Sequence, residues 1–135
     1  MTLQAKIPEL RIVTMEAGET MAFDQLIVPG QERWDKVYPK NLARMLDMIG
    51  DEKMKVVAYL LRKKDTMNLV SATMREISAG TGVSLKTVNK VMQTMQKNDF
   101  MHKVKAGKWR LSPRIICGGK QSIGMATINY YDNVD

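Results

Sequence analysis

The segment that most constrains the fold runs from Thr73 to Lys97 and reads TMREISAGTGVSLKTVNKVMQTMQK. Glu76 follows Thr73 by three residues, which is the spacing of a capping box. In that motif the hydroxyl and the carboxylate each accept a backbone amide that the start of a helix leaves unpaired. The pattern predicts that a short helix begins at Met74.

A glycine turn and a second cap follow this short helix. Gly80 and Gly82 bracket a tight turn, where the chain needs positive φ or a close approach of two backbone segments. Ser84 then supplies an N-cap oxygen for a longer helix from Leu85 to about Asn98. Two capped helices joined through a glycine turn form a helix-turn-helix.

The longer helix separates its apolar and polar residues onto two faces. Apolar residues recur at three-to-four spacing and predict a buried stripe made of Leu85, Val88, Val91 or Met92, and Met95. The open face then carries Lys86, Thr87, Asn89, Lys90, Gln93 and Lys97. Lysine binds phosphate, Asn and Gln can pair bidentately with adenine, and the start of a recognition helix reaches the base edges. An ordinary solvated helix face has a similar composition, so the helix alone leaves both interpretations open.

The residues after this helix favour a basic β-hairpin. Residues 100–111, FMHKVKAGKWRL, alternate around a two-residue Ala106-Gly107 turn. We expect one face to carry Phe100, His102, Val104, Trp109 and Leu111. The other face or the tip then carries Lys103, Lys105, Lys108 and Arg110. A helix-turn-helix followed by such a hairpin is a winged helix, so the predicted fold class is mainly α with a small antiparallel β-sheet (α+β).

Positive charge concentrates in the longer helix and the hairpin. Between Ser84 and Lys120 there are nine Lys or Arg residues and one acidic residue, Asp99, which gives a net charge of +8. The whole chain carries +7, so the remaining residues sum to −1. Charge confined to these elements is expected of a phosphate-binding surface, because each neutralised phosphate releases condensed counterions. This context favours double-stranded DNA as the partner.

Several stretches of this region also resemble one protein family. They are REISAGTGVSLKTVNKVMQTMQKNDF, a basic hairpin ending in KWRLSPRII, the preceding VYPKNLARMLDMIG and the following INYYD. Over about Trp34 to Tyr131 the chain is similar to the firmicute plasmid replication protein family RepL. The helix-turn-helix pattern alone is shared with many winged-helix regulators of the MarR and GntR kinds, whereas the flanks are more specific. The resemblance implies a winged-helix DNA-binding protein needed for replication of a plasmid, or of a phage or integrated element.

We expect one globular domain with a short extension at each end. Residues 1–33 should form a β-rich arm or hairpin, with strands within Glu9–Val28 and a hairpin around Ala17–Glu19. The DNA-binding domain should span residues 34–131. Residues 132–135 read as a frayed acidic tail.

Apolar spacing, prolines and caps predict the remaining elements of the domain. They are an extended piece at Trp34–Tyr38, a helix at Pro39–Ile49 stopped by Gly50, a helix capped by Asp51, a strand at Asn68–Ala72 that pairs with the hairpin, and a last strand at Ile123–Tyr131. The helix capped by Asp51 is apolar around most of its circumference, so we expect it at the centre of the core. Its apolar residues are Met54, Val56, Val57, Ala58, Tyr59, Leu60 and Leu61.

The sequence offers little material for catalysis. His102 is the only histidine, so the chain cannot build the histidine pair that holds the metal of rolling-circle nicking enzymes. Cys117, the only cysteine, excludes an internal disulfide, fits a reducing cytoplasm and should be a small buried residue. We read Tyr130 and Tyr131 as packing and dimer-interface residues. The longest apolar run, Val56–Leu61, is too short to span a bilayer, and we predict a cytoplasmic, non-enzymatic protein without metal, cofactor or membrane partner.

Combined with the resemblance, these patterns predict sequence-specific binding of duplex DNA in replication initiation, by a homodimer that does not cut. The major groove would be read by Lys86, Thr87, Asn89, Lys90 and Gln93. Phosphates would be held by Lys103, Lys105, Lys108 and Arg110, and Arg75 with Ser84 would position the helix pair. Two alternatives remain: a transcription repressor that uses the same residues, and a protein-interaction winged helix that recruits a host polymerase or primase component.

Overall fold

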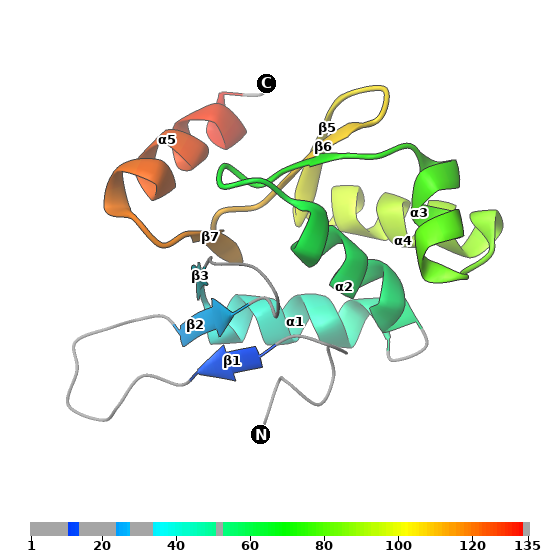
Figure 1. Ribbon diagram of the computed structural model, residues 1–135, viewed down its shortest axis with the longest axis horizontal. Helices are drawn as coiled ribbons and strands as arrows, with labels where there is room; N and C mark the ends of the chain where they lie inside the picture. Colours follow the sequence, from blue (N-terminus) through cyan, green and yellow to red (C-terminus); the bar gives the residue numbers. More distant parts are fainter. Residues whose placement is uncertain (1–10, 14–23, 28–33, 51–52, 134–135) are drawn as a thin grey trace.

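The computed structural model describes residues 11–13, 24–27, 34–50 and 53–133, and in these it contains five helices and seven strands (Figure 1). In chain order they are β1 (Arg11–Val13), β2 (Asp24–Ile27), β3 (Trp34–Val37), α1 (Pro39–Ile49), α2 (Met54–Lys63), β4 (Leu69–Ser71), α3 (Met74–Thr81), α4 (Leu85–Lys97), β5 (Met101–Lys105), β6 (Lys108–Leu111), β7 (Ile116–Gly118) and α5 (Gln121–Asp132). The strands form two antiparallel sheets, ordered β1-β2-β3-β7 and β4-β6-β5. The predicted α+β class is confirmed.

The elements around the helix-turn-helix follow the predicted order. α2, β4, α3, α4 and the β5–β6 hairpin succeed one another, and β4 pairs with β6 as the third strand of the smaller sheet. α3 begins at Met74 and α4 at Leu85, as predicted. The hairpin turns through Ala106 and Gly107, and Gly107 has the positive φ of 73° that such a turn requires. α1 also has its predicted bounds, and Gly50 follows it with a φ of 88°.

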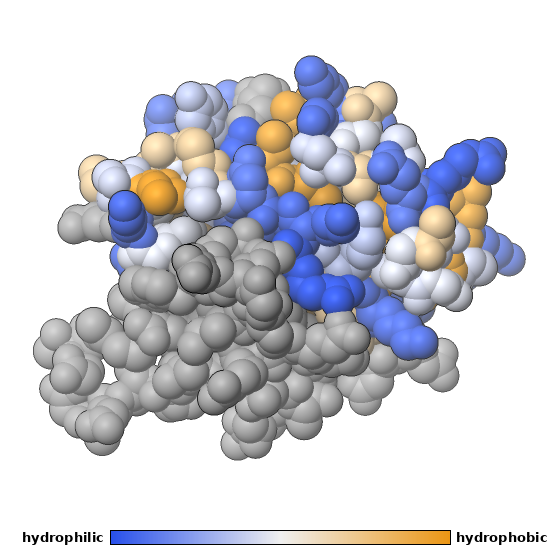
Figure 2. Space-filling view, in the orientation of Figure 1, coloured by the Kyte–Doolittle hydropathy of each residue, from blue (hydrophilic) through white to orange (hydrophobic). Residues whose placement is uncertain are grey.

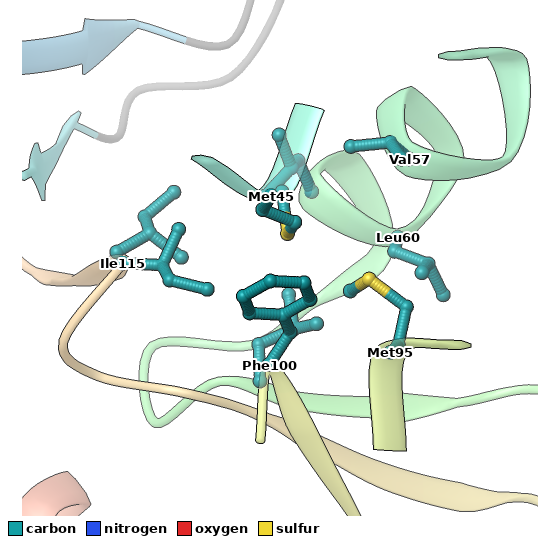
Figure 3. Close-up of a pocket in the computed structure, with 9 residues that line it drawn as sticks. Met45, Val57, Leu60, Met95, Phe100 and Ile115 are labelled. Carbon is teal, nitrogen blue, oxygen red and sulfur yellow. The ribbon is translucent and has the colours of Figure 1, made fainter. Parts of the chain in front are cut away.

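The core forms where α2 meets α1, α4 and the smaller sheet. Seven residues of α2 are buried, namely Met54, Val56, Val57, Ala58, Tyr59, Leu60 and Leu61, which confirms the central place predicted for this helix. Figure 3 shows Met45 of α1, Leu60 of α2, Met95 of α4 and Phe100 converging in this interior. Burying one such side chain contributes about 1.5–3 kcal/mol relative to leaving it exposed. The core therefore fixes α4 against α1 and α2.

The C-terminal segment is a helix, and the predicted strand at Ile123–Tyr131 is wrong. Isoleucine, threonine and tyrosine favour strands by propensity, but burial here follows the period of a helix. Gly124, Thr127 and Tyr131 are buried and lie three and four residues apart. A Cβ atom at Gly118 of β7 would come within 2.7 Å of Ile123 Cγ2, so that glycine lets α5 pack closely on β7.

The predicted faces of the hairpin are also wrong for one strand. The register pairs Lys103 with Trp109 and His102 with Arg110. Cross-strand partners share a face, so Lys103 lies with Trp109, whereas His102 is on the opposite face. Phe100 precedes β5 and belongs to the connection from α4. The alternation therefore begins one residue later than predicted, and a shift of one residue exchanges the two faces.

Three remaining points concern the N-cap of α2, the N-terminal strands and a strand that the sequence did not predict. The N-cap residue of α2 is Lys53, without a side-chain bond, and the predicted cap Asp51 lies outside the described residues. β1 and β2 pair as the N-terminal strands predicted, while the turn expected at residues 17–19 lies outside the described residues. β7, which the sequence did not predict, pairs with β3 and joins the C-terminal region to the larger sheet.

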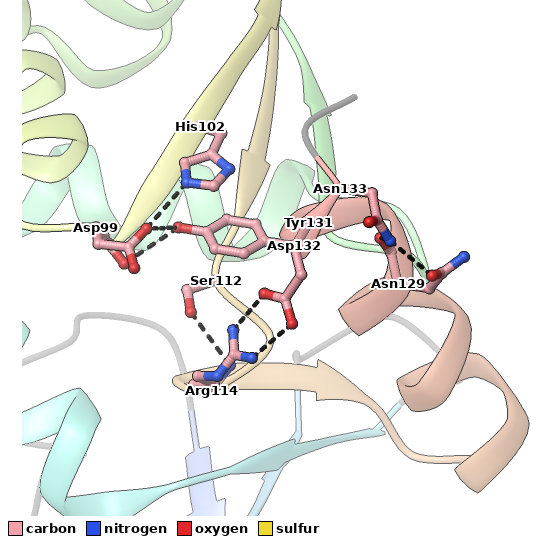
Figure 4. A network of polar contacts seen from close by, with 8 residues as sticks. All are labelled: Asp99, His102, Ser112, Arg114, Asn129, Tyr131, Asp132 and Asn133. Atoms are coloured by element: carbon pink, nitrogen blue, oxygen red, sulfur yellow. Dashed lines mark hydrogen bonds and ion pairs between the residues drawn. The ribbon is translucent and has the colours of Figure 1, made fainter.

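A polar network attaches α5 to the hairpin and to the segment after it (Figure 4). Tyr131 donates its hydroxyl to Asp99 Oδ1 at 2.7 Å, and its ring stacks on the imidazole of His102 with centroids 3.8 Å apart. Arg114 donates to both carboxylate oxygens of Asp132, at 2.8 and 2.7 Å. Asp132, assigned from the sequence to the frayed tail, is the last residue of α5. The two tyrosines differ, because Tyr131 is buried and Tyr130 is half-exposed.

Candidate nucleic-acid interface

The start of α3 is held by the predicted capping box. Thr73 Oγ1 accepts the Glu76 amide at 3.1 Å, and Glu76 Oε1 accepts the Thr73 amide at 3.1 Å. The hydrogen bonds from Thr73 lower the pKa of the Glu76 carboxyl below its ordinary value. The ionised carboxylate also lies in the first helical turn, where the helix dipole favours negative charge. The orientation of α3 is therefore set from its first residue.

The connection from α3 to α4 combines a glycine stop with a serine cap. Gly82 ends α3 in the left-handed region, with a φ of 73° and a ψ of 11°. Ser84 Oγ accepts the Thr87 amide at 3.2 Å and caps α4 as predicted. Gly80, predicted to be part of the turn, lies inside α3. A Cβ atom there would come within 2.6 Å of the Tyr59 ring, so the glycine allows α3 to pack on α2.

α4 buries its predicted stripe with one exception. The buried residues are Val88, Val91, Met92 and Met95. The exposed polar residues are Lys86, Asn89, Lys90, Gln93 and Lys97, and Thr87 is half-buried with its hydroxyl accepting a bond from Ser84 at 3.0 Å. Leu85, predicted to be buried, is 41% exposed. It is the first residue of α4, and the helix first reaches the core one turn later, at Val88.

The tip of the β5–β6 hairpin is held against the start of α3. The amide of Ala72 donates to the Gly107 carbonyl at 2.9 Å, and Trp109 Nε1 donates to the Ala72 carbonyl at 3.0 Å. Lys108 Nζ donates to Ser71 Oγ at 2.7 Å. These bonds place the basic tip beside the first residue of α3. The hairpin tip and the helix-turn-helix therefore form adjoining parts of one surface.

The hairpin lysines remain accessible, and the register places Lys103 on the face opposite to Lys108. Lys103 and Lys105 are exposed, and Lys108 is half-buried. The ammonium group of Lys103 lies 5.5 Å from the centre of the Trp109 ring, which is within cation–π range. An ammonium group has three donors, so Lys108 keeps donors for an anion while it binds Ser71. Arg75, the second residue of α3, is exposed as well.

Arg110 was predicted to bind phosphate together with the hairpin lysines, but it is not placed to do so. Its side chain is only 8% exposed, and Nη1 donates to the Met67 carbonyl at 2.6 Å. The guanidinium also lies 5.2 Å from the centre of the Tyr130 ring. The reason is α5, because Arg110 shares a face of the hairpin with His102 and the α5 residues Tyr130 and Tyr131 lie against that face. Arg110 therefore leaves the set of candidate phosphate-binding residues.

An open groove lies between the start of α3 and the first turns of α4, and we call it the α3–α4 groove. It is lined by Met74, Leu85, Lys86 and Asn89. Figure 2 shows an apolar patch among hydrophilic residues at the end of the molecule where α3 and α4 lie (right). Met74 and Leu85 were missed by reasoning from the sequence. The available signal was their place directly after the two N-cap residues, where a helix has not yet reached the core.

Other chemistry is sparse in the part of the chain that the structure describes. Within it, no three His, Cys, Asp or Glu side chains lie close enough together to hold a metal ion. Cys117 is buried, as predicted, and burial raises the pKa of its thiol. Among these same residues, no helix combines the length and apolar character needed to cross a membrane.

Known proteins similar to this chain are replication proteins. The model of the firmicute plasmid replication protein (RepL) family matches residues 5–135, so the similarity extends to the N-terminal strands, beyond the Trp34–Tyr131 range of the resemblance. A replication and maintenance protein of Bacillus subtilis is 34% identical over 111 residues, which cover 81% of this chain and 75% of that protein. Proteins of the same name from Staphylococcus aureus and Staphylococcus epidermidis are also 34% identical over 111 residues, which cover 70% and 68% of their lengths. No solved structure matches the chain.

Proposed function

The chain belongs to the firmicute plasmid replication protein (RepL) family, and from that premise we propose that it initiates replication by binding duplex DNA at an origin. The replicon would be a plasmid, or a phage or mobile element with a related gene. In this proposal the protein works in the cytoplasm as a winged helix-turn-helix. It recruits host replication proteins or distorts the duplex, and it does not cut DNA.

The observation that carries the proposal is that two neighbouring elements, α4 and the β5–β6 hairpin, are basic and contain no acidic residue. α4 and the β5–β6 hairpin contain six lysines and no Asp or Glu. Asp99, the acidic residue between them, is bonded to Tyr131 and His102. Opposing charge is thus absent from both elements, which supports a polyanionic partner over an ordinary solvated face.

The adjoining positions of α4 and the hairpin support a two-part contact with duplex DNA. The first turns of α4 present Lys86, Asn89 and Lys90 at the exposed end of the helix. A helix start of this kind fits the major groove and brings amide side chains to base edges. The hairpin lysines Lys105 and Lys108 lie beside the start of α3 and would bind phosphates of the same duplex.

The state of the single histidine supports a non-enzymatic role. His102 Nε2 lies 2.9 Å from Asp99 Oδ1, and its ring is stacked on Tyr131. His102 therefore packs against the C-terminal end of α5. Strand cutting by the rolling-circle route requires a metal held by a histidine pair, and the sequence has one histidine.

We further infer that the protein acts as a homodimer through the outer face of α5. Met125 is 64% exposed and Ile128 is 39% exposed, and they lie three residues apart on one face of the helix. A second copy with its own α5 antiparallel to this helix would cover Met125 and Ile128 with the same two side chains.

The dimer proposal is tested by sedimentation of the wild-type protein and of Met125→Glu. The wild type should sediment as a dimer, and a charge in the centre of the interface should give a monomer. Met48→Glu is the matched control, because Met48 is 46% exposed on α1. A monomeric wild type, or equal behaviour of the two variants, contradicts the assignment of α5.

DNA binding is tested with two variants that lose the same charge. Lys86→Ala/Lys105→Ala removes two lysines from the proposed surface, and Lys40→Ala/Lys55→Ala removes two exposed lysines from α1 and α2. Binding to a labelled duplex should weaken with salt in every case. The slope of log K against log salt should fall by about two for the first variant and stay unchanged for the second. Equal slopes would contradict the proposed surface.

The role in replication is tested in cells that carry a plasmid dependent on this protein. Lys86→Ala/Lys105→Ala should reduce plasmid copy number, whereas Lys40→Ala/Lys55→Ala should maintain it. Transcripts from the same plasmid, normalised to copy number, separate initiation from repression. A variant that binds DNA poorly, keeps copy number and raises transcription would favour a repressor.

A further inference from the structure

The α3–α4 groove is lined by both apolar and polar side chains, and packing of the core does not require an apolar residue at Leu85. Met74 is partly buried against the core, whereas Leu85 is 41% exposed and Lys86 and Asn89 are exposed. Four other residues of α4 already fill the core below it. A single exposed leucine is ordinary on a protein surface. Leu85 differs from an ordinary exposed leucine because it lies beside the Asn89 amide and the Lys86 ammonium group, at the start of a basic helix.

The geometry of α4 sets Leu85 and Asn89 side by side. They are four residues apart, so their side chains occupy neighbouring positions on one face of the helix. Lys86 and Lys90 repeat the same spacing on the adjacent stripe. One stripe therefore pairs an apolar group with an amide, and the other presents two positive charges.

This combination matches the major-groove edge of an A·T base pair. That edge presents the C5-methyl group of thymine, which takes apolar contacts, and the N6 and N7 atoms of adenine, which Asn binds bidentately. A G·C pair presents no methyl group and suits Arg or Lys at the guanine edge. The neighbouring phosphates suit the two lysines.

We propose that Leu85, backed by Met74, contacts the methyl group of a thymine, next to an adenine that Asn89 reads. The target then contains at least one A·T pair where the start of α4 enters the major groove. This inference rests on the proposed function, because it assigns base preference to the same DNA-binding surface. It adds Leu85 as a specificity-determining residue. Leu85 was predicted to belong to the buried stripe because the residue is apolar.

The test removes the methyl group from the DNA instead of altering the protein first. A preferred duplex is selected with the full chain from a random pool, and each thymine is replaced in turn by deoxyuracil, which lacks only the C5-methyl group. Affinity for the wild type should fall about fourfold at one or two positions, as expected for losing one buried methyl group. The remaining positions should show no change.

The protein variant Leu85→Ala then assigns the contact. It should bind the thymine duplex about fourfold more weakly or worse, and it should no longer distinguish thymine from uracil at the sensitive position. Met48→Ala, at an exposed methionine of α1, is the control and should keep the full uracil effect. Circular dichroism of each variant checks that its helices are intact.

The outcomes separate this inference from the proposed function. A selected sequence that tolerates uracil at every position overturns the methyl contact and leaves DNA binding standing. A uracil effect that persists in Leu85→Ala overturns the role of Leu85. If no duplex is enriched and none binds at moderate salt, both the inference and the proposed function fail.

Discussion

The backbone amide of Ala72 donates to the carbonyl of Gly107 at 2.9 Å, and this bond joins the end of β4 to the tip of the basic hairpin. The bonds from Trp109 to Ala72 and from Lys108 to Ser71 hold the same end of the hairpin. The bond between Ala72 and Gly107 holds the hairpin tip beside Thr73, the N-cap residue of α3. Its geometry depends on the left-handed conformation of Gly107, whose φ is 73°.

Gly107→Val should therefore destabilise the protein by about 1–2 kcal/mol, since a β-branched residue is strained at positive φ. Space is not the cause, because a Cβ atom at Gly107 would meet Thr73 Cγ2 at an ordinary 3.7 Å. Urea denaturation measures the loss. Gly107→Asn is the control, because asparagine tolerates the left-handed region, and it should cost less. Equal losses for the two variants would contradict the strain argument.

Arg110→Ala should lower stability and leave the salt dependence of DNA binding unchanged. The substitution removes the bond to the Met67 carbonyl and the contact with the Tyr130 ring, at a cost of about 1–3 kcal/mol. Urea denaturation and a salt series of binding measurements are made on the same variant. Lys105→Ala should behave in the opposite way, with near wild-type stability and a salt slope reduced by about one. A reduced slope for Arg110→Ala would return it to the phosphate-binding set.

Lys64→Ala should be among the most destabilising changes in the chain. Lys64 Nζ lies 2.8 Å from Asp35 Oδ1, both side chains have no solvent exposure, and the pair joins the end of α2 to β3. Removing one partner leaves a buried charge uncompensated, which costs about 3–5 kcal/mol. Replacing both, as in Asp35→Leu/Lys64→Met, should recover much of that loss because no buried charge remains. Urea denaturation of the single and double variants gives both values, and similar stabilities for the two would contradict this account.

Asn89→Ala should change which duplexes the protein prefers. If the amide reads a base edge, the variant should lose about 1–3 kcal/mol on a selected duplex and little on random duplex. Lys105→Ala should weaken binding to both duplexes alike, because its proposed phosphate contact carries no sequence information. Competition binding measures the ratio directly. Equal losses for Asn89→Ala on selected and random duplexes would remove it from the base-reading residues.

The sequence predicted the parts of the fold that are determined locally. Thr73 with Glu76, and Ser84 with Thr87, form their caps from residues three apart, so the helix starts are legible in the chain. Pro39 likewise marks the first turn of α1. The positive charge of α4 and the hairpin could also be predicted, because two elements that contain lysines and no acidic residues are basic however they pack.

The parts that sequence reasoning missed depend on tertiary contacts. Ile123–Tyr131 has strand propensity, but the buried faces of Thr127 and Tyr131 require a helix. Arg110 is buried because Tyr130 of α5 and the Met67 carbonyl lie against its face of β6, and strand alternation does not show which face another element covers. Leu85 is exposed because the core lies one turn further along α4. Each of these outcomes is decided by what packs against the residue, and the one-dimensional pattern does not contain that information.

Tyr131→Phe should separate the stabilising hydrogen bond of α5 from its packing. Phenylalanine keeps the stack on His102 and loses the 2.7 Å bond to Asp99 Oδ1, at a cost of about 1–2 kcal/mol near neutral pH. Burial, and then the Asp99 carboxylate, raise the pKa of Tyr131 above its ordinary value of 10.0. The unfolded chain therefore loses this proton near pH 10 while the folded chain keeps it, so the contribution to stability is full below pH 10 and falls as the pH rises.

The wild type should thus lose stability above pH 10 more steeply than Tyr131→Phe, by up to about 1.4 kcal/mol per pH unit for one proton. Urea denaturation at a neutral and a strongly alkaline pH measures the difference. Tyr130→Phe is the control, since Tyr130 is half-exposed, and it should keep the alkaline loss seen in the wild type. If the free energy of unfolding falls equally for the wild type and Tyr131→Phe above pH 10, another group causes the alkaline loss of stability. Tyr131 would then not be the titrating residue that holds α5.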